Sequence, residues 1–277
     1  MTNRKILKLF NSKPTSDGDG VKIRRVATNG DIGALDPFLL FDEIASDDAA
    51  DYIGGFPSHP HRGFETVTYM LEGAFTHRDH MGNEGHLRTG GVQWMTAGKG
   101  VIHSEMPEQE EGRLHGFQIW VNLPAKDKMQ PARYQEFDPE QVPQVSLSEG
   151  GLVRVIAGSL LGVEGPVKEV ATNPSYFDIR LSANTAIDIP TLQEHNAIAY
   201  VYKGQLQVDG QSIDQGQLAQ FSNGEQVTIT AQEDAGLLFL SAAPINEPIA
   251  NYGPFVMNTR AEIEQAISDY RAGVLTD

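Results

Sequence analysis

The chain contains no cysteine, few basic residues and no long apolar run. With Cys 0 among its 277 residues, it can form no disulfide, offer no thiolate to a metal and use no thiol nucleophile. Any bound metal must therefore be held by nitrogen and oxygen atoms. No apolar stretch is long enough to span a bilayer, and the short apolar stretch near Met1 does not resemble a signal peptide. We expect a cytoplasmic protein with no membrane partner.

The chain is also poor in positive charge. Its 21 Lys and Arg residues are outnumbered by 37 Asp and Glu residues, which gives a formal net charge of −16. Proteins that bind nucleic acid usually present a basic patch to the phosphate backbone. The charge balance therefore disfavours direct contact with DNA or RNA. A protein partner, if there is one, would be expected to offer a basic surface.

The apolar pattern is that of a mainly β protein. Short runs of alternating apolar residues recur along the chain and are separated by Gly, Asp and Asn at turn spacing. The runs are Val21–Val26, Pro37–Phe41, Glu65–Leu71, Val92–Thr96, Phe117–Leu123, Val153–Ala157, Tyr176–Leu181, Ala197–Tyr202 and Leu237–Ala242. Such a series favours a β-sandwich or a β-barrel.

One helix is predicted, near the C-terminus. Thr259 and Glu262 have the spacing of a capping box, and Gly273 would end the helix. Between them, apolar and aromatic side chains follow at helical spacing at Ile263, Ile267 and Tyr270.

A weak internal repeat divides the chain. Tyr69, Gly73, Gly90 and Gly98 in the first half correspond to Tyr200, Gly204, Gly216 and Gly224 in the second. The spacing from Tyr to the first Gly and the spacing between the last two glycines are the same in both halves. We therefore predict two related β-barrels, residues 1–140 and residues 141–277, joined by the stretch Pro124–Pro143.

Seven of the 8 histidines fall between His59 and His115, and their pattern indicates a metal site. The two informative segments are His59-Pro60-His61 and His103-Ser104-Glu105. Alternate side chains of a β-strand point to the same face, so each segment would offer two ligands on one face. Three imidazoles and one carboxylate suit a first-row divalent metal.

The repeat assigns this chemistry to the first half alone. Aligned onto the second half, the four ligand positions fall near Pro190, near Leu192, on Ile229 and on Ala231. None of these side chains is a metal ligand. The second barrel is therefore expected to be structural or to help form a pocket.

Glu65 admits several interpretations. It follows His61 after three residues, where a carboxylate could remain on the face of the histidine pair if the strand is regular. It could be a ligand or a base. It could also support the site without touching the metal, for example by accepting the second ring proton of a histidine.

The remaining histidines are expected to be outside the metal site. His77, His80 and His86 fall in a predicted hairpin, where a surface position is the expected one. His115 precedes a strand and is expected to pack, and His195 stands apart from the cluster.

Several long segments, in order along the chain, resemble the pirin family of the cupin superfamily. They are residues 35–43, 56–67, 93–107 and 252–259, and the likeness extends over roughly residues 17 to 273. The resemblance implies two cupin-type β-barrels (double-stranded β-helices, or jelly rolls) in tandem, with a short C-terminal helix. It also implies one mononuclear metal in the N-terminal barrel, bound by His59, His61, His103 and Glu105. Iron(II) is the expected metal, and Ni, Cu, Mn, Co or Zn would suit the same ligands.

The resemblance also implies an activity. Bacterial pirins include quercetin 2,3-dioxygenases, which cleave a flavonol with O₂ and release carbon monoxide. The flavonol and O₂ would be the partners of this chain, Glu105 would take the substrate proton, and we expect a monomer. A second hypothesis is an iron- or redox-sensing regulatory protein that acts through protein contact. A third, an isomerase or other non-redox cupin enzyme, is disfavoured by the pirin motifs.

Overall fold

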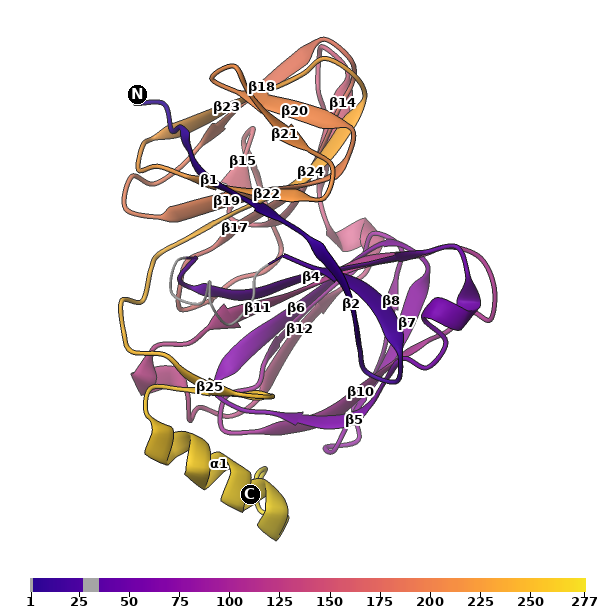
Figure 1. Cartoon of the computed structure of the whole chain (residues 1–277), viewed down its shortest axis with the longest axis vertical. Coiled ribbons are helices and arrows are strands. Elements are labelled where there is room, and N and C mark those ends of the chain that lie inside the picture. Colours follow the sequence, from indigo (N-terminus) through magenta and orange to yellow (C-terminus); the bar gives the residue numbers. More distant parts are fainter. Residues whose placement is uncertain (1, 27–34) are drawn as a thin grey trace. The chain divides into compact units, whose positions relative to one another are not determined.

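The computed structural model describes residues 2–26 and 35–277. The chain forms two compact units. The first barrel consists of Pro14–Pro139 together with Ile245–Asp277, and the second barrel consists of Met1–Lys13 together with Glu140–Pro244. Both units are built from antiparallel strands (Figure 1).

The first barrel has a seven-stranded sheet in the order β12-β9-β6-β11-β4-β3-β2 and a four-stranded sheet in the order β5-β10-β7-β8. Its strands are β2 (Lys13–Asp17), β3 (Val21–Arg25), β4 (Phe38–Ser46), β5 (Phe56–His61), β6 (Phe64–Glu72), β7 (Ala74–Asp79), β8 (Glu84–Arg88), β9 (Val92–Thr96), β10 (Val101–Pro107), β11 (Leu114–Asn122) and β12 (Arg133–Phe137). Three short 3₁₀ helices connect strands: η1 (Ala49–Asp51), η2 (Ala125–Asp127) and η3 (Pro139–Gln141).

The second barrel repeats this plan with the sheet orders β1-β22-β19-β24-β17-β14-β13 and β18-β23-β20-β21. Its strands are β1 (Ile6–Asn11), β13 (Gln144–Ser146), β14 (Gly151–Ala157), β17 (Ser175–Leu181), β18 (Thr185–Pro190), β19 (Asn196–Lys203), β20 (Gln205–Val208), β21 (Gln211–Asp214), β22 (Gln217–Phe221), β23 (Gln226–Ala231) and β24 (Ala235–Ala242), with the small pair β15 (Ser159–Leu160) and β16 (Val163–Glu164). The predicted architecture, two cupin domains, is therefore confirmed.

The units differ from the predicted consecutive segments because the two ends of the chain are exchanged. Strand β1, at the N-terminus, pairs with β22 of the second barrel, and the C-terminal residues 245–277 belong to the first barrel. The predicted linker 124–143 contains β12, which pairs with β9 of the first barrel. Strands β1 and β12 thus cover the corresponding edges of the two large sheets, and an unpaired edge would expose a row of backbone groups. Spacing of apolar residues cannot show which edge a strand will cover.

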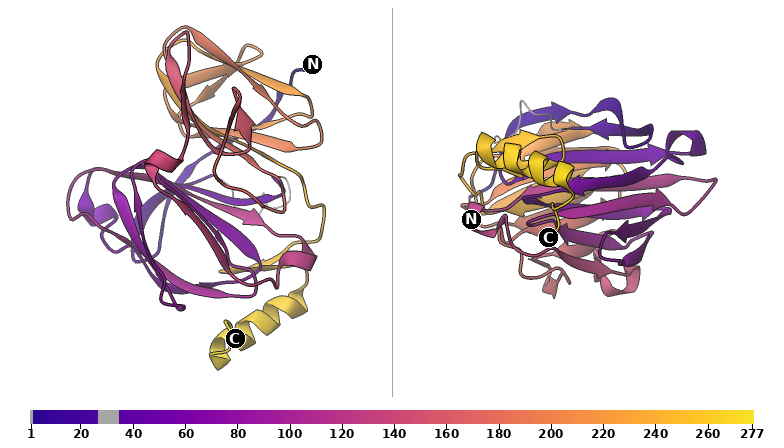
Figure 2. Two further views of the ribbon diagram at one scale, coloured as in Figure 1. Left: turned by 180° about the vertical axis from the view of Figure 1, so that it is seen from behind. Right: turned by 90° about the horizontal axis from the view of Figure 1, so that it is seen from below.

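The C-terminal segment of the first barrel consists of β25 (Ala250–Tyr252), β26 (Phe255–Met257) and α1 (Arg260–Ala272). The predicted capping box and the final glycine are confirmed: Thr259 accepts from the backbone of Glu262, and Gly273 is left-handed with φ 73°. Helix α1 lies on the outside of this unit (Figure 2) and buries Ile263 and Ala266.

No helix in the described part of the chain is long and apolar enough to cross a bilayer.

A buried lysine of the first barrel forms a hydrogen bond with the C-terminal segment. The Nζ of Lys128 donates to the carbonyl oxygens of Gly63 and Val256, at 2.6 and 3.0 Å, and to Oδ1 of Asn122 at 2.6 Å. The side chain is 1% exposed, and its burial lowers the pKa to about 8. Three acceptors match the three protons of an ammonium group, so the charged form is well accommodated.

We predict that Lys128→Met destabilises the protein by about 2 to 4 kcal/mol, because three buried oxygens lose their donor. Urea unfolding measures this change. The control is Lys126→Met, since Lys126 lies two residues away and is exposed. Equal free energies of unfolding for the two variants would show that the buried ammonium does not stabilise the segment.

Candidate metal centre

Three histidines converge in the first barrel. Strands β5 and β10 pair antiparallel, with His103 opposite His59 and Val101 opposite His61. One ring nitrogen from each of His59, His61 and His103 lies within 4.8 Å of the other two. The alternation of side chains along two paired strands therefore brings together the three imidazoles that the sequence pattern singled out.

The facing nitrogens of His59 and His61 have a spacing that suits two ligands of one cation. Their Nε2 atoms are 3.0 Å apart, and Nδ1 of His59 lies 2.8 Å from the carbonyl oxygen of Pro57. A carbonyl only accepts, so His59 carries its proton on Nδ1 and directs the Nε2 lone pair at His61. Two nitrogens bound to one ion at about 2.1 Å and at right angles would be roughly 3.0 Å apart, so the spacing fits a shared metal.

His103 supplies the third nitrogen. Its Nε2 is buried and has no hydrogen-bond partner, whereas its Nδ1 lies 2.9 Å from Nε2 of His77. Burial lowers the pKa of His61 and of His103 well below the usual value, and the neighbouring histidines lower it further. Both rings are therefore neutral, which is the form that binds a metal.

Glu105 lies two residues beyond His103 on β10 but is not part of the three-histidine group. Its Oε1 accepts from Oγ1 of Thr68 at 3.0 Å, and its Oε2 accepts from Nε2 of Gln118 at 2.9 Å. Thr68 and Gln118 face each other on the paired strands β6 and β11. The carboxylate is thus buried and held from two sides.

Glu65 accepts a hydrogen bond from a residue of β9. Its Oε1 accepts from Oγ1 of Thr96 at 2.7 Å, and the two residues face each other across the β6–β9 ladder. Gly63, with φ 89°, separates β5 from β6, so the regular strand assumed for Glu65 and the histidine pair is interrupted. Burial raises the pKa of Glu65 to about 7, and the hydrogen bond from Thr96 opposes this rise.

The prediction of a surface position was wrong for His77 and right for His80 and His86. His77 is 3% exposed on β7 and contacts His103, whereas His80 and His86 are exposed. The sequence contains the missed signal, because Phe75, His77 and Asp79 alternate along a strand and should share one face.

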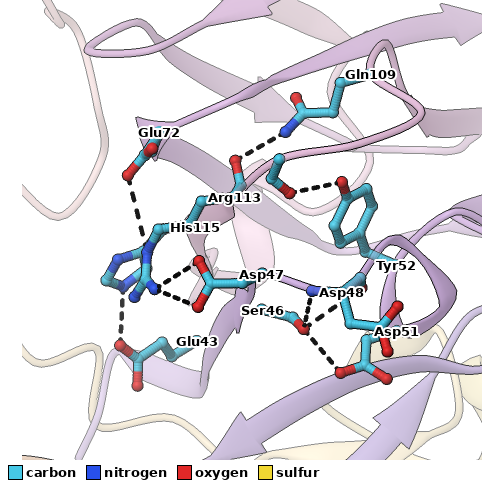
Figure 3. Close-up of polar contacts among 11 residues, drawn as sticks. Glu43, Ser46, Asp47, Asp48, Asp51, Tyr52, Glu72, Gln109, Arg113 and His115 are labelled. Atoms are coloured by element: carbon cyan, nitrogen blue, oxygen red, sulfur yellow. Dashed lines mark hydrogen bonds and ion pairs between the residues drawn. The ribbon is translucent and has the colours of Figure 1, made fainter.

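His115 packs away from the centre, as predicted, but it does so in a buried polar pair. Its Nε2 lies 2.9 Å from Oε1 of Glu43, next to the exposed ion pair of Arg113 with Asp47 (Figure 3). His195 lies in the second barrel, where its carbonyl oxygen accepts from Arg4 at 2.8 Å.

The second barrel has isoleucines where the first has histidines. In the β18–β23 ladder, Ile229 pairs with Ile187 and Val227 pairs with Ile189, as His103 pairs with His59 and Val101 with His61. The counterparts of the histidine pair are thus Ile187 and Ile189, not Pro190 and Leu192, because strand register and not residue spacing sets the correspondence. All four residues at the ligand positions, Ile187, Ile189, Ile229 and Ala231, are buried in one apolar core.

A cavity of about 690 Å³ lies over the histidines of the first barrel and is lined in part by His59 and His61. Its other walls are mostly apolar or aromatic, with Leu39, Leu40, Phe56, Pro57, Trp120, Pro254 and Val256, and its polar groups are on Asp17, Arg25, Gln118 and Asn251. Arg25 is already paired with Asp42 at 2.6 Å and with Asp17 at 2.6 Å. A flat, largely apolar molecule with a few hydroxyl groups would suit this lining.

The fold and the three-histidine centre define a bicupin in which, among the residues that the structure describes, the group of candidate metal ligands lies in the first barrel. Family models agree: the pirin model matches residues 20–121, and the model of the pirin C-terminal cupin domain matches residues 176–276. The chain belongs to the pirin family.

Two relatives and one solved structure illustrate the relationship. A Vibrio cholerae protein provisionally named quercetin 2,3-dioxygenase is 52% identical over 98% of this chain and 97% of its own length. A Pseudomonas aeruginosa protein with the same provisional name is 48% identical over 98% of each chain. The crystal structure of a quercetin 2,3-dioxygenase from Acinetobacter baumannii superposes with a TM-score of 0.92 and is 35% identical, covering 99% of this chain and 98% of that one.

We predict that Glu65→Gln makes the protein less sensitive to pH. Because the folded-state pKa of about 7 is above the ordinary value of 4.5, this group stabilises the fold below pH 4.5, and its contribution is lost as the pH rises through 7. The wild type should lose about 3 kcal/mol across that interval relative to the variant. Urea unfolding at pH 5, 6, 7 and 8 measures the difference, and parallel stability profiles would contradict the assignment.

Proposed function

We propose that the first barrel binds one divalent metal through His59, His61 and His103, with Glu105 as a fourth ligand, and that the protein is a dioxygenase that cleaves a flavonol such as quercetin. Iron(II) is our proposed metal, although Ni, Cu, Mn, Co and Zn accept the same donors. Four protein ligands would leave coordination positions of the metal open to substrate and O₂.

The observation that carries the proposal is the cavity over the histidines. A structural metal site is closed by protein ligands, whereas a catalytic site keeps open positions that small molecules can reach. Here a cavity of about 690 Å³ reaches His59 and His61, and its walls are suited to the rings of a flavonol. The relatives with quercetinase names support this choice of substrate.

The protein side chains would have three tasks. The apolar walls, with Phe56 and Trp120, would bind the flavonol rings and exclude water. The carboxylate of Glu105 would accept the proton of the 3-hydroxyl group, and Thr68 and Gln118 would keep that carboxylate in place. When bound, the metal would lower the pKa of the flavonol 3-hydroxyl group and would be the redox centre for the reaction with O₂.

A second candidate function is an iron- or redox-sensing regulatory protein that acts through protein contact. The net charge of −16 favours a basic protein partner for this role and disfavours nucleic acid. The ligands would be the same in both functions, so substrate turnover separates them. For either function, we expect the protein to be a cytoplasmic monomer.

We predict that the protein reconstituted with Fe(II) consumes O₂ and releases carbon monoxide in equal amounts when quercetin is added. His103→Ala should lower the rate by at least about 100-fold, because a metal ligand is lost. An oxygen electrode with a carbon monoxide assay measures both gases.

The matched control for that experiment is His86→Ala, which removes an exposed histidine of the same barrel and should leave turnover unchanged. Tight binding of one metal ion without quercetin turnover would contradict the dioxygenase and favour the sensor.

A further inference from the structure

Next to the three-histidine centre, two imidazole rings are in contact through one ring nitrogen of each. His77 on β7 and His103 on β10 lie on neighbouring strands, and Nε2 of His77 is 2.9 Å from Nδ1 of His103. Their ring centroids are 5.1 Å apart, and both side chains are buried, at 3% and 2% exposed. Such a contact requires one nitrogen to carry the proton and the other to offer a lone pair.

The two possible arrangements are not equivalent. If His77 donated to Nδ1 of His103, the proton of His103 would be on Nε2, which is buried and has no acceptor. A buried donor without a partner is costly, and this one would direct its hydrogen into the three-histidine group. If His103 donates from Nδ1 instead, its Nε2 offers a lone pair to that group.

His59 has the same arrangement with a different acceptor. Its Nδ1 lies 2.8 Å from the carbonyl oxygen of Pro57, so its proton is on Nδ1 and its Nε2 carries a lone pair. The corresponding acceptor for His103 is a side chain, and the orientation of that side chain must be fixed as well. The ring of His77 packs edge-on against Tyr134 of β12, with centroids 5.1 Å apart and planes at 60°.

We propose that His77 is a positioning residue: by accepting the Nδ1 proton, it holds His103 in the tautomer whose Nε2 faces the other two histidines. The consequence for metal affinity rests on the proposed function, whereas the tautomer of His103 does not. Partners of this kind around metal ligands typically change metal affinity 10- to 100-fold.

The first test uses the metal-free protein. Two-bond ¹H–¹⁵N correlation spectra distinguish an imidazole protonated on Nδ1 from one protonated on Nε2. We expect the Nδ1–H tautomer for His103 in the wild type and in His77→Gln, whose amide oxygen can accept the same proton. In His77→Leu we expect a shift toward the Nε2–H tautomer. An Nε2–H tautomer in the wild type would overturn the proposal, even if the Leu variant does not fold.

The second test measures nickel(II) affinity by calorimetry for the same proteins. We expect His77→Leu to bind about 10- to 100-fold more weakly than the wild type and His77→Gln to recover most of that loss. The control is His86→Leu, which is exposed and should bind as the wild type does. Thermal melting of each metal-free variant checks folding.

The outcomes separate the two claims. If the wild type has the expected tautomer but binds no nickel(II), the proposed metal centre is contradicted and the role of His77 stands. If the wild type binds nickel(II) and His77→Leu keeps both the tautomer and the affinity, the role of His77 is contradicted and the centre stands.

Discussion

The register of β5 against β10 is the constraint on which the centre depends. It sets His103 opposite His59 and Val101 opposite His61, so alternate side chains of the two strands meet on one face. A shift of one residue would turn these side chains to the other face, because strands have a period of two. The positions of the three candidate ligands, of the cavity over them and of the contacts made by Thr68, Gln118 and His77 all depend on this alignment.

In the second barrel, the positions that correspond to the three histidines are apolar. Ile187, Ile189 and Ile229 occupy the corresponding places and are buried in a continuous apolar core. In the first barrel, the same places contain imidazoles, and those of His61 and His103 each leave a buried nitrogen without a hydrogen-bond partner. Buried polar atoms of this kind lower stability unless something binds them. At these positions the first barrel therefore lacks the apolar packing that the second barrel has.

Much of the fold could be predicted from the sequence. Alternating apolar runs identified the central strands, and Thr259, Glu262 and Gly273 marked the ends of helix α1 because capping depends on local spacing. The convergence of His59, His61 and His103 followed from their alternation. The burial of His77 could have been read from the alternation along β7, but its contact with His103 could not, because that contact depends on β7 pairing with β10. Local patterns also cannot decide which barrel a terminal strand joins.

The exchange of the chain ends has a consequence for biosynthesis. The wall of the cavity includes Asn251, Pro254 and Val256, which follow the second-barrel segment Glu140–Pro244 in the chain and are synthesised after it. Lys128 has its third acceptor, the carbonyl oxygen of Val256, only once that residue has been synthesised. Strand β1 likewise has no partner strand until β22 has been synthesised. A nascent chain that has only residues 1–140 therefore has neither a finished barrel nor a finished cavity.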